Sequence, residues 1–166
     1  MENVDEYKAR LLLLMEGKDP RTVQHETAGQ LAELIAAIPA EKLGQRPAQD
    51  KWSVAEILAH LSEAEIASSW RYRQMIEHDG AVLSSYDQDL WKSLGEYSAR
   101  DAKKSLQLFQ LLREANLQMF DLLSPEQWQR YGMHIERGRM SLGDLARLVA
   151  GHDINHIEQI RKIVGK

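Results

Sequence analysis

Two histidines one helical turn apart are the residues of this sequence best suited to chemistry. They are His152 and His156 in the stretch GHDINHIEQI, residues 151–160. Residues four apart on a helix project from one face, so both imidazoles could bind one metal ion. With six histidines in the chain, chance alone would produce this spacing in roughly one such sequence in five. The alternative is two core histidines bonded to carbonyls or carboxylates, so the metal interpretation needs a third ligand.

His60, in EILAHLSEAE, is the candidate third ligand. It lies in the middle of an apolar helical stretch, close to Ile57 and Leu61, which directs it inward. A single inward histidine is more often an ordinary core residue. Together with His152 and His156, however, it predicts a site for one divalent metal ion, either Zn, Ni or Fe(II). Three imidazoles would leave coordination positions open for water or substrate.

Several polar residues are candidates for assisting such a site. Arg71 follows His60 by about three helical turns on nearly the same face, where it would orient an anionic group above the metal. The alternative for Arg71 is a surface ion pair with Glu65 or Glu77. Further candidates for contacts with the ligands or the substrate are Asn155, Gln159, Glu56, Glu63, Tyr86 and Asp87. The remaining histidines lack a partner at ligand spacing and are expected at the surface: His25, His78 and His134.

The elements that must position these residues are predicted to be helices. Apolar residues recur at three- and four-residue steps over residues 22–38, 54–77, 100–123 and 141–163, with a shorter segment over 4–16. Ser53 with Glu56, and Ser141 with Asp144, are typical of helix N-termini. No segment alternates convincingly with period two, so no sheet is expected, and residues 131–140 are either loop or a short extended piece. The pattern predicts an all-α protein, a four-helix bundle with a short extra N-terminal helix.

Composition narrows the function classes. A length of 166 residues with 43% hydrophobic content predicts one globular domain over 1–166, with its core at about 20–164. The net charge of −4 and the lack of a Lys/Arg cluster argue against a nucleic-acid partner. Without cysteine, thiolate metal sites and cysteine nucleophiles are excluded. The short apolar run LLLLM is too brief for a membrane span, so a cytoplasmic protein without a membrane partner is expected.

The absence of several known catalytic motifs excludes some kinds of active site, and one long loop indicates where a substrate pocket could open. HExxH, GxSxG and the paired ExxH of ferritin-like di-iron bundles are absent from the sequence. Residues 78–101 form its least regular region, with two glycines and four serines. A loop of that length in a compact domain is usually functional. We expect it to help form the mouth of a substrate pocket.

Two stretches carry a resemblance to a known family. KWSVAEILAHLSEAE (51–65) followed by MSLGDLARLVAGHDINHIEQI (140–160) resembles the DinB-like superfamily of four-helix metal-binding proteins. The shared features are Trp-Ser before the helix, Ala-His-Leu within it and Gly-His-Asp-x-Asn-His-x-x-Gln-Ile near the end. The resemblance covers roughly residues 20–164. It implies that His60, His152 and His156 are the metal ligands, that the bundle has the family's unusual connectivity, and that the protein is a homodimer.

The resemblance also implies a range of activities. Members of this family carry out thiol transfer with low-molecular-weight thiols such as bacillithiol, mycothiol-dependent isomerisation and the metal-binding part of ergothioneine synthesis, and many are described as metal-dependent hydrolases. The leading hypothesis is a thiol S-transferase or hydrolase that acts on a small molecule after the metal lowers the pKa of a thiol or water. The competing hypothesis is a non-catalytic, stress-related bundle whose histidines hold a structural metal or none. An open pocket lined by residues 80–95 would favour the enzyme.

Overall fold

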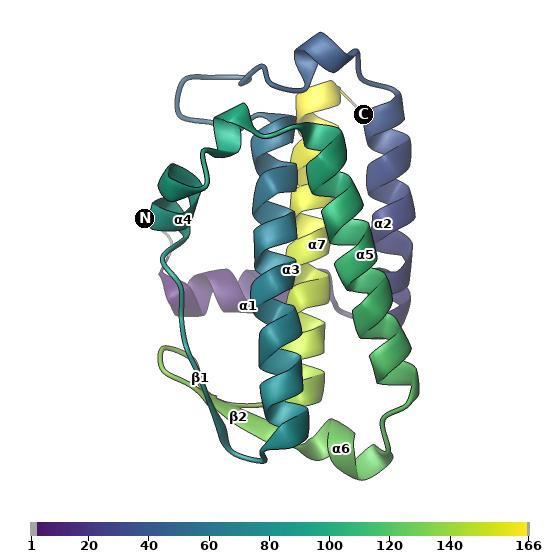
Figure 1. Cartoon of the computed structure of the whole chain (residues 1–166), viewed down its shortest axis with the longest axis vertical. Coiled ribbons are helices and arrows are strands. Elements are labelled where there is room, and N and C mark those ends of the chain that lie inside the picture. Colours follow the sequence, from purple (N-terminus) through teal and green to yellow (C-terminus); the bar gives the residue numbers. More distant parts are fainter. Residues whose placement is uncertain (1–2, 166) are drawn as a thin grey trace.

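A bundle of four long helices forms the centre of the computed structural model, which describes residues 3–165 (Figure 1). These helices are α2 (Pro20–Ala36), α3 (Val54–Glu77), α5 (Ala102–Asp121) and α7 (Leu142–Val164). The predicted helical bundle is therefore confirmed. Each predicted boundary differs from the observed one by no more than two residues, which is the usual uncertainty at helix ends.

Local sequence explains where the two ligand-bearing helices begin. Ser53 accepts a hydrogen bond from the backbone N–H of Glu56, and the Glu56 carboxylate accepts one from the backbone N–H of Ser53. Ser141 and Asp144 form the same reciprocal pair at the start of α7. Each pair satisfies backbone donors that the first turn of a helix leaves free. Both predicted caps are confirmed.

Neighbours in the bundle are not neighbours in the sequence. Helices α2 and α3 each pack against α5 and α7, so the successive helices α2 and α3 lie diagonally across the bundle. Helices α3 and α5 run in the same direction, because residues 78–101 return along the length of the bundle before α5 begins (Figure 1). This order brings α3 and α7, the two histidine-bearing helices, side by side.

A small three-stranded sheet shows that the expectation of no sheet was wrong. Strand β1 (Ala81–Leu83) pairs in parallel with β2 (Tyr131–His134), which pairs antiparallel with β3 (Gly138–Ser141). Strands of three or four residues are too short for period-two alternation to be recognised. His134, which was expected at the surface, is only 3% exposed, because β2 is the middle strand of the sheet and packs against α3.

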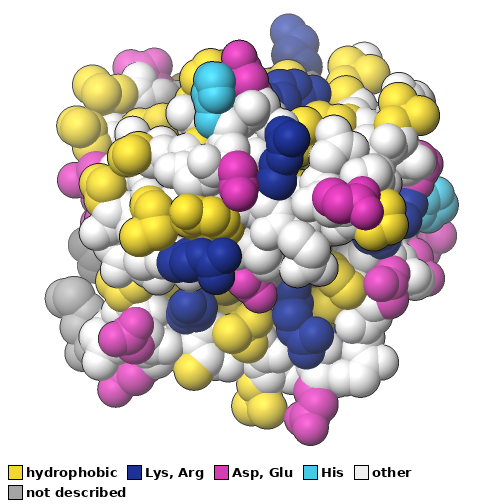
Figure 2. Space-filling view, turned by 90° about the horizontal axis from the view of Figure 1, so that it is seen from below, with side chains coloured by type: hydrophobic (Ala, Val, Ile, Leu, Met, Phe, Trp, Pro, Cys, Tyr) yellow, Lys and Arg dark blue, Asp and Glu magenta, His cyan; other side chains and the backbone are white. Residues whose placement is uncertain are grey.

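The connections contain further short elements. Residues 78–101, expected to be loop, include β1, helix α4 (Gln88–Leu94) and a 3-10 turn (Tyr97–Ala99). The other two are helix α6 (Pro125–Gln129) and a 3-10 turn (Ala40–Lys42). Among the helices described, none is both long enough and apolar enough to cross a membrane. Basic, acidic and apolar side chains are interspersed on the face seen in Figure 2.

Helix α1 (Val4–Leu14) lies across the bundle instead of along it (Figure 1). It packs against α7, and the two helices approach closely at Gly151. A Cβ atom at this position would lie 2.3 Å from the carbonyl oxygen of Leu11, a separation that no side chain tolerates. The glycine that precedes His152 is therefore explained by helix packing.

Candidate metal centre and adjoining pocket

Three imidazoles converge between α3 and α7. The Nε2 atom of His152 lies 2.9 Å from Nε2 of His60 and 3.1 Å from Nε2 of His156. The candidate ligand atoms of all three residues lie within 4.8 Å of one another. The structure thus brings together the three histidines that the sequence pattern selected from two separate helices.

The donor set and its spacing fit a metal ion. A ligand nitrogen lies about 2.0–2.1 Å from zinc, so two nitrogens on one ion are roughly 2.9–3.4 Å apart at tetrahedral or octahedral angles. The two measured Nε2–Nε2 separations, 2.9 and 3.1 Å, fall within this interval. A neutral imidazole has only one N–H donor and one acceptor nitrogen. Three nitrogens that face one another therefore cannot all be satisfied among themselves.

Burial keeps the three imidazoles neutral. Desolvation lowers the pKa of His60 to about 3, with His156 adding to the effect. Desolvation also lowers the pKa of His156 to about 4, although its hydrogen bond to Gln159 opposes the shift. The pKa of His152 is held well below its ordinary value, first by desolvation and then by the two neighbouring histidines. A neutral imidazole has the free lone pair that a metal ligand needs.

The outer nitrogens of the ligands differ in their surroundings. Oε1 of Gln159 lies 2.9 Å from Nδ1 of His156, so Gln159 can accept the Nδ1–H bond and direct the Nε2 lone pair inward. Nδ1 of His60 is buried without a hydrogen-bond partner in the described part of the chain. The His60 ring packs edge-on against Trp52, with ring centroids 5.2 Å apart. Of these two Nδ1 atoms, only that of His156 has an oriented acceptor among the described residues.

The acidic residues near His60 have other partners. Glu56 closes the capping box of α3 and pairs with Arg46. Glu63 pairs with Arg100 at 2.6 Å. No hydrogen bond joins either carboxylate to His60 in residues 3–165, so the structure gives both a helix-end or surface ion-pair role.

A pocket of about 180 Å³ adjoins His152. Its walls come from α1, α3 and α7, from the start of α4 with the segment before it, and from β2 with the turn between β2 and β3. Polar side chains from these elements line it: Ser68, Arg71, Tyr86, Gln88, His134 and Arg137. The long loop therefore contributes to the pocket, as the sequence predicts.

The structure separates the remaining candidates into two groups. Arg71 and Tyr86 line the pocket, and the Cζ atom of Arg71 lies 5.5 Å from the centre of the Tyr86 ring. Asp87 is exposed and caps α4 by accepting from the backbone N–H of Leu90. Asn155 accepts a hydrogen bond from Arg10 of α1. Asp87 and Asn155 thus stabilise the elements around the site and do not line the pocket.

Arg71 is buried and has no carboxylate partner among the described residues. Its side chain is 7% exposed, and its guanidinium donates to the backbone carbonyl of Ser84. The surface ion pair considered for it is not formed, because the Glu65 carboxylate binds Arg113 instead. Desolvation lowers the pKa of Arg71, and nearby Arg137 also lowers it.

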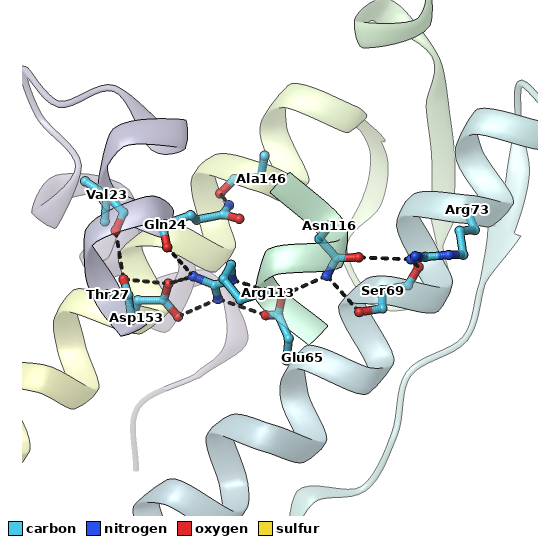
Figure 3. Close-up of polar contacts among 10 residues, drawn as sticks. All are labelled: Val23, Gln24, Thr27, Glu65, Ser69, Arg73, Arg113, Asn116, Ala146 and Asp153. Atoms are coloured by element: carbon cyan, nitrogen blue, oxygen red, sulfur yellow. Dashed lines mark hydrogen bonds and ion pairs between the residues drawn. The ribbon is translucent and has the colours of Figure 1, made fainter. Parts of the chain in front are cut away.

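A second buried polar cluster, the Arg113 network, joins all four long helices (Figure 3). Arg113 of α5 donates to both carboxylate oxygens of Glu65 on α3, at 2.9 and 2.8 Å, and to both of Asp153 on α7, at 2.6 and 3.2 Å. Asn116 donates to Glu65, and Thr27 of α2 donates to Asp153. All three guanidinium nitrogens and all four carboxylate oxygens therefore have partners.

Arg113 stays charged despite its burial. Desolvation opposes the charge on Arg113, but Asp153 and Glu65 outweigh it and raise the pKa of Arg113. Desolvation raises the pKa of Asp153, and Arg113 opposes that shift. The network holds α7 in one rotation about its axis, because Asp153 must face Arg113. That rotation also directs His152 and His156 toward His60.

Comparison with known proteins shows the family. The model of the DinB superfamily matches residues 25–160. The chain belongs to the DinB superfamily. Among curated proteins, this DinB-superfamily chain is 23% identical to "Putative metal-dependent hydrolase YfiT" of Bacillus subtilis over 162 residues, 96% of this chain and 91% of YfiT. It is 26% identical to "Putative metal-dependent hydrolase OB0782" of Oceanobacillus iheyensis over 112 residues, 68% of this chain but only 64% of that relative, which is less than two thirds of its length.

Solved structures show the same fold. The structure of YfiT from B. subtilis, described as an unusual four-helix bundle topology, matches with a TM-score of 0.79 at 20% identity and covers 88% of this chain and 86% of YfiT. A mycothiol-dependent maleylpyruvate isomerase matches with a TM-score of 0.62 at 12% identity, over 85% of this chain and 59% of the isomerase. At these identities the likeness concerns the fold alone.

The sequence pattern of this DinB-superfamily chain did not indicate that two further residues line the pocket. His134 lies on β2, and Arg137 lies in the turn between β2 and β3. Neither belongs to a helix, so helical spacing does not relate them to the ligands. The Arg113 network was missed for a related reason, because periodicity does not show which residues of different helices meet.

Proposed function

We propose that this chain is a metal-dependent enzyme, a hydrolase or a thiol S-transferase, with one divalent ion (Zn, Ni or Fe) held by His60, His152 and His156. The observation that carries the proposal is the convergence of three neutral imidazoles beside a pocket that reaches His152. The names of the curated relatives support hydrolysis. A mycothiol-dependent isomerase shares the fold, so the proposal includes a thiol substrate as the alternative to water.

The residues of this chain would prepare the site for a nucleophile. The chemistry that a bound divalent ion supplies is a lower pKa of a water or thiol, which makes the nucleophile available near neutral pH. Gln159 holds His156 in one tautomer, and the Arg113 network holds α7 in register with α3. Leu11 from α1 and Tyr86 from the segment before α4 line the pocket, where they limit access of bulk water.

A set of three protein ligands favours an enzyme over a non-catalytic bundle. Structural zinc sites are closed by four protein ligands, whereas catalytic sites have three and keep one position free. Within residues 3–165, no fourth ligand-type side chain joins the three histidines. The nearest candidate in sequence, Asp153, has both oxygens bonded to Arg113.

Metal analysis with the His60→Ala variant tests the proposal. The purified protein should contain about one metal ion per chain, and chelation should abolish activity that added metal restores. His60→Ala should lose metal and activity, while the metal-free forms of variant and wild type should unfold at similar denaturant concentrations. His25→Ala, on the exposed face of α2, is the matched control and should behave as wild type. Full activity of the wild type in chelator would contradict the proposal.

A paired activity screen separates the two reaction classes. The metal-loaded protein would be assayed with ester or amide substrates alone, and with an electrophile plus each of several cellular thiols. Turnover that requires a thiol supports the S-transferase, and turnover with water alone supports the hydrolase. The homodimer implied by the family resemblance stays a prediction, which sedimentation of the metal-loaded protein would test.

A further inference from the structure

We infer that the pocket beside His152 recognises an oxyanion group of the substrate, a carboxylate or a phosphate, through Arg71, Arg137 and His134. This inference rests on the proposed function, because it names the substrate class of that site. It extends the role first considered for Arg71 to two residues of the β2–β3 hairpin.

Two arginines face this pocket without a carboxylate partner among the residues described. Arg71 is 7% exposed and donates to one backbone carbonyl. The Nε atom of Arg137 is buried and has no hydrogen-bond partner in the part of the chain that the structure describes. The two guanidinium groups lie close enough for Arg137 to lower the pKa of Arg71. Placing two like charges together in a partly buried pocket is unfavourable unless an anion joins them.

His134 supplies a third donor. Its Nδ1 atom accepts a hydrogen bond from the backbone N–H of Glu136 at 3.2 Å, which places the proton of the neutral ring on Nε2. Desolvation, and then Arg71 and Arg137, lower the pKa of His134 to about 4. Near neutral pH, His134 therefore adds an N–H donor to the pocket without adding charge.

The acidic residues that line the same pocket do not occupy these donors. Glu65 and Asp153 direct all their oxygens to Arg113, Asn116 and Thr27. Glu136 is exposed and forms no ion pair with either arginine in the described chain, although its charge raises the pKa of Arg71 and of His134. With a divalent ion on the histidines, the region around the pocket carries excess positive charge.

The size and walls of the pocket indicate a small ligand. Its volume of about 180 Å³ is below the roughly 300–1,000 Å³ of sites for drug-sized molecules. Leu61, Leu145 and Leu148 form apolar parts of its wall. This combination suits a short carbon skeleton whose anionic group binds the arginines while its reactive group lies toward His152.

Nuclear magnetic resonance of arginine side chains tests the inference directly. Acetate and methyl phosphate would be titrated separately, at constant ionic strength, into zinc-loaded and chelator-treated protein, while the Nε–H signal of Arg137 is followed. At least one anion should bind saturably and shift this signal. The anion that binds more tightly identifies the group as carboxylate or phosphate. Failure of both anions to bind in either form of the protein would overturn the inference.

Substitutions distinguish anion binding in this pocket from non-specific attraction of anions to positive charge on the protein. Arg137→Gln should weaken anion binding at least tenfold, and Arg71→Lys, which keeps the charge but loses the planar fork, should weaken it several-fold. Arg139→Gln is the matched control, because Arg139 lies on the exposed side of the same hairpin, against Tyr131. It should bind anions as wild type does. Equal affinity in the Arg137 and Arg139 variants would overturn the inference.

The metal content of each variant distinguishes the inference from the proposed function. If Arg137→Gln loses anion affinity but retains zinc, the result supports both the anion site and the metal site of the proposed function. If the wild type takes up no metal yet binds an anion through Arg137, the proposed function fails and the anion site stands. If zinc binds and Arg137 has no effect on anions, the anion site fails alone. Circular dichroism of each variant confirms that it is folded.

Discussion

Two buried polar clusters lie next to each other in the bundle and differ in how completely their groups are bonded. In the Arg113 network, every guanidinium nitrogen and carboxylate oxygen has a partner. In the adjoining pocket, and within residues 3–165, Arg71 has one backbone partner and Nε of Arg137 has none. Consecutive residues of α7 contribute differently: both oxygens of Asp153 are bonded within the network, whereas His152 faces the other two histidines beside the pocket. The fully bonded groups of the network stabilise the fold, whereas the incompletely bonded groups of the pocket are available to a ligand.

The physical basis of this difference is the cost of burying charge. A buried ion pair is stable only when additional hydrogen bonds satisfy both partners, as they do around Arg113. Unsatisfied donors reduce the free energy of unfolding and persist only where the surrounding structure compensates for them. The satisfied network therefore supplies the rigidity that lets the neighbouring pocket keep unpaired donors.

Removing the cation of the network should have the largest effect. Arg113→Met leaves Glu65 and Asp153 buried without their partner, which should lower the free energy of unfolding by about 3–5 kcal/mol. Urea denaturation measures it. The control is Arg21→Gln. The side chains of Arg21 and its ion-pair partner Asp121 are 47% and 65% exposed, so this substitution should lower the free energy of unfolding by less than about 1 kcal/mol. A similar small loss in both variants would show that the network is dispensable.

Lowering the pH should reduce the free energy of unfolding, because His134, which lines the pocket, has a lowered pKa in the folded protein. Its pKa is about 4 in the folded protein and near 6.5 when unfolded. Below pH 6.5 the unfolded chain therefore binds a proton that the folded chain does not, and stability falls until about pH 4. The loss should reach up to roughly 3 kcal/mol, at about 1.4 kcal/mol per pKa unit.

The variant His134→Gln isolates this titration from the other histidines. Its unfolding free energy would be compared with that of wild type at several pH values between 7 and 4. The variant should lose less stability than wild type over this interval, because glutamine does not titrate. Parallel curves would show that His134 is not the group responsible.

Displacing α1 should affect the pocket while leaving the network intact. In Gly151→Ala the new Cβ would lie 2.3 Å from the Leu11 carbonyl oxygen, so α1 must move at a cost of about 1–3 kcal/mol. In Gly143→Ala, on the same helix, the new Cβ would lie 3.7 Å from the hydroxyl oxygen of Ser141, so this variant should be neutral or stabilising by up to about 1 kcal/mol. Thermal unfolding of both variants, with hydrogen exchange of α1, checks the expectation. Unchanged exchange in α1 would contradict the packing explanation.

Removing the acceptor behind His156 should have the smallest effect on folding. Gln159→Leu leaves Nδ1 of His156 without its partner, which should lower metal affinity about 10- to 100-fold and change stability by about 1 kcal/mol. Competition with a chelator measures the affinity. Gln159→Glu keeps an acceptor and should retain most of it. If leucine and glutamate variants bind metal equally, the hydrogen bond does not orient the ligand.

The helices and the ligand triad were predictable because their signals are local. Residues 54–77 have a clear helical period and a capping box, and the observed helix α3 has those limits. His152 and His156 are one turn apart, so any helix places them together. The inward position of His60 follows from its apolar neighbours. That these three residues hold a metal stays a proposal.

The short strands and the pocket residues were not predictable in this way. Strands β1 and β2 are far apart in the chain and pair over three residues, which leaves no recognisable period. His134 became buried because of that pairing. The ion-pair partner of Glu65 was not identifiable either, because helical spacing contains no information about which helix packs opposite.

The sequence by itself thus determined the helical class, the helix starts and the face of α7 that carries two imidazoles, because each depends on residues within a few turns of one another. The tertiary structure alone decided that α3 lies beside α7, that α1 crosses at Gly151, and that Arg71, Arg137 and His134 meet in one pocket. The physical reason is that these contacts join residues distant in the chain, and their free energy comes from packing and desolvation that no single segment possesses.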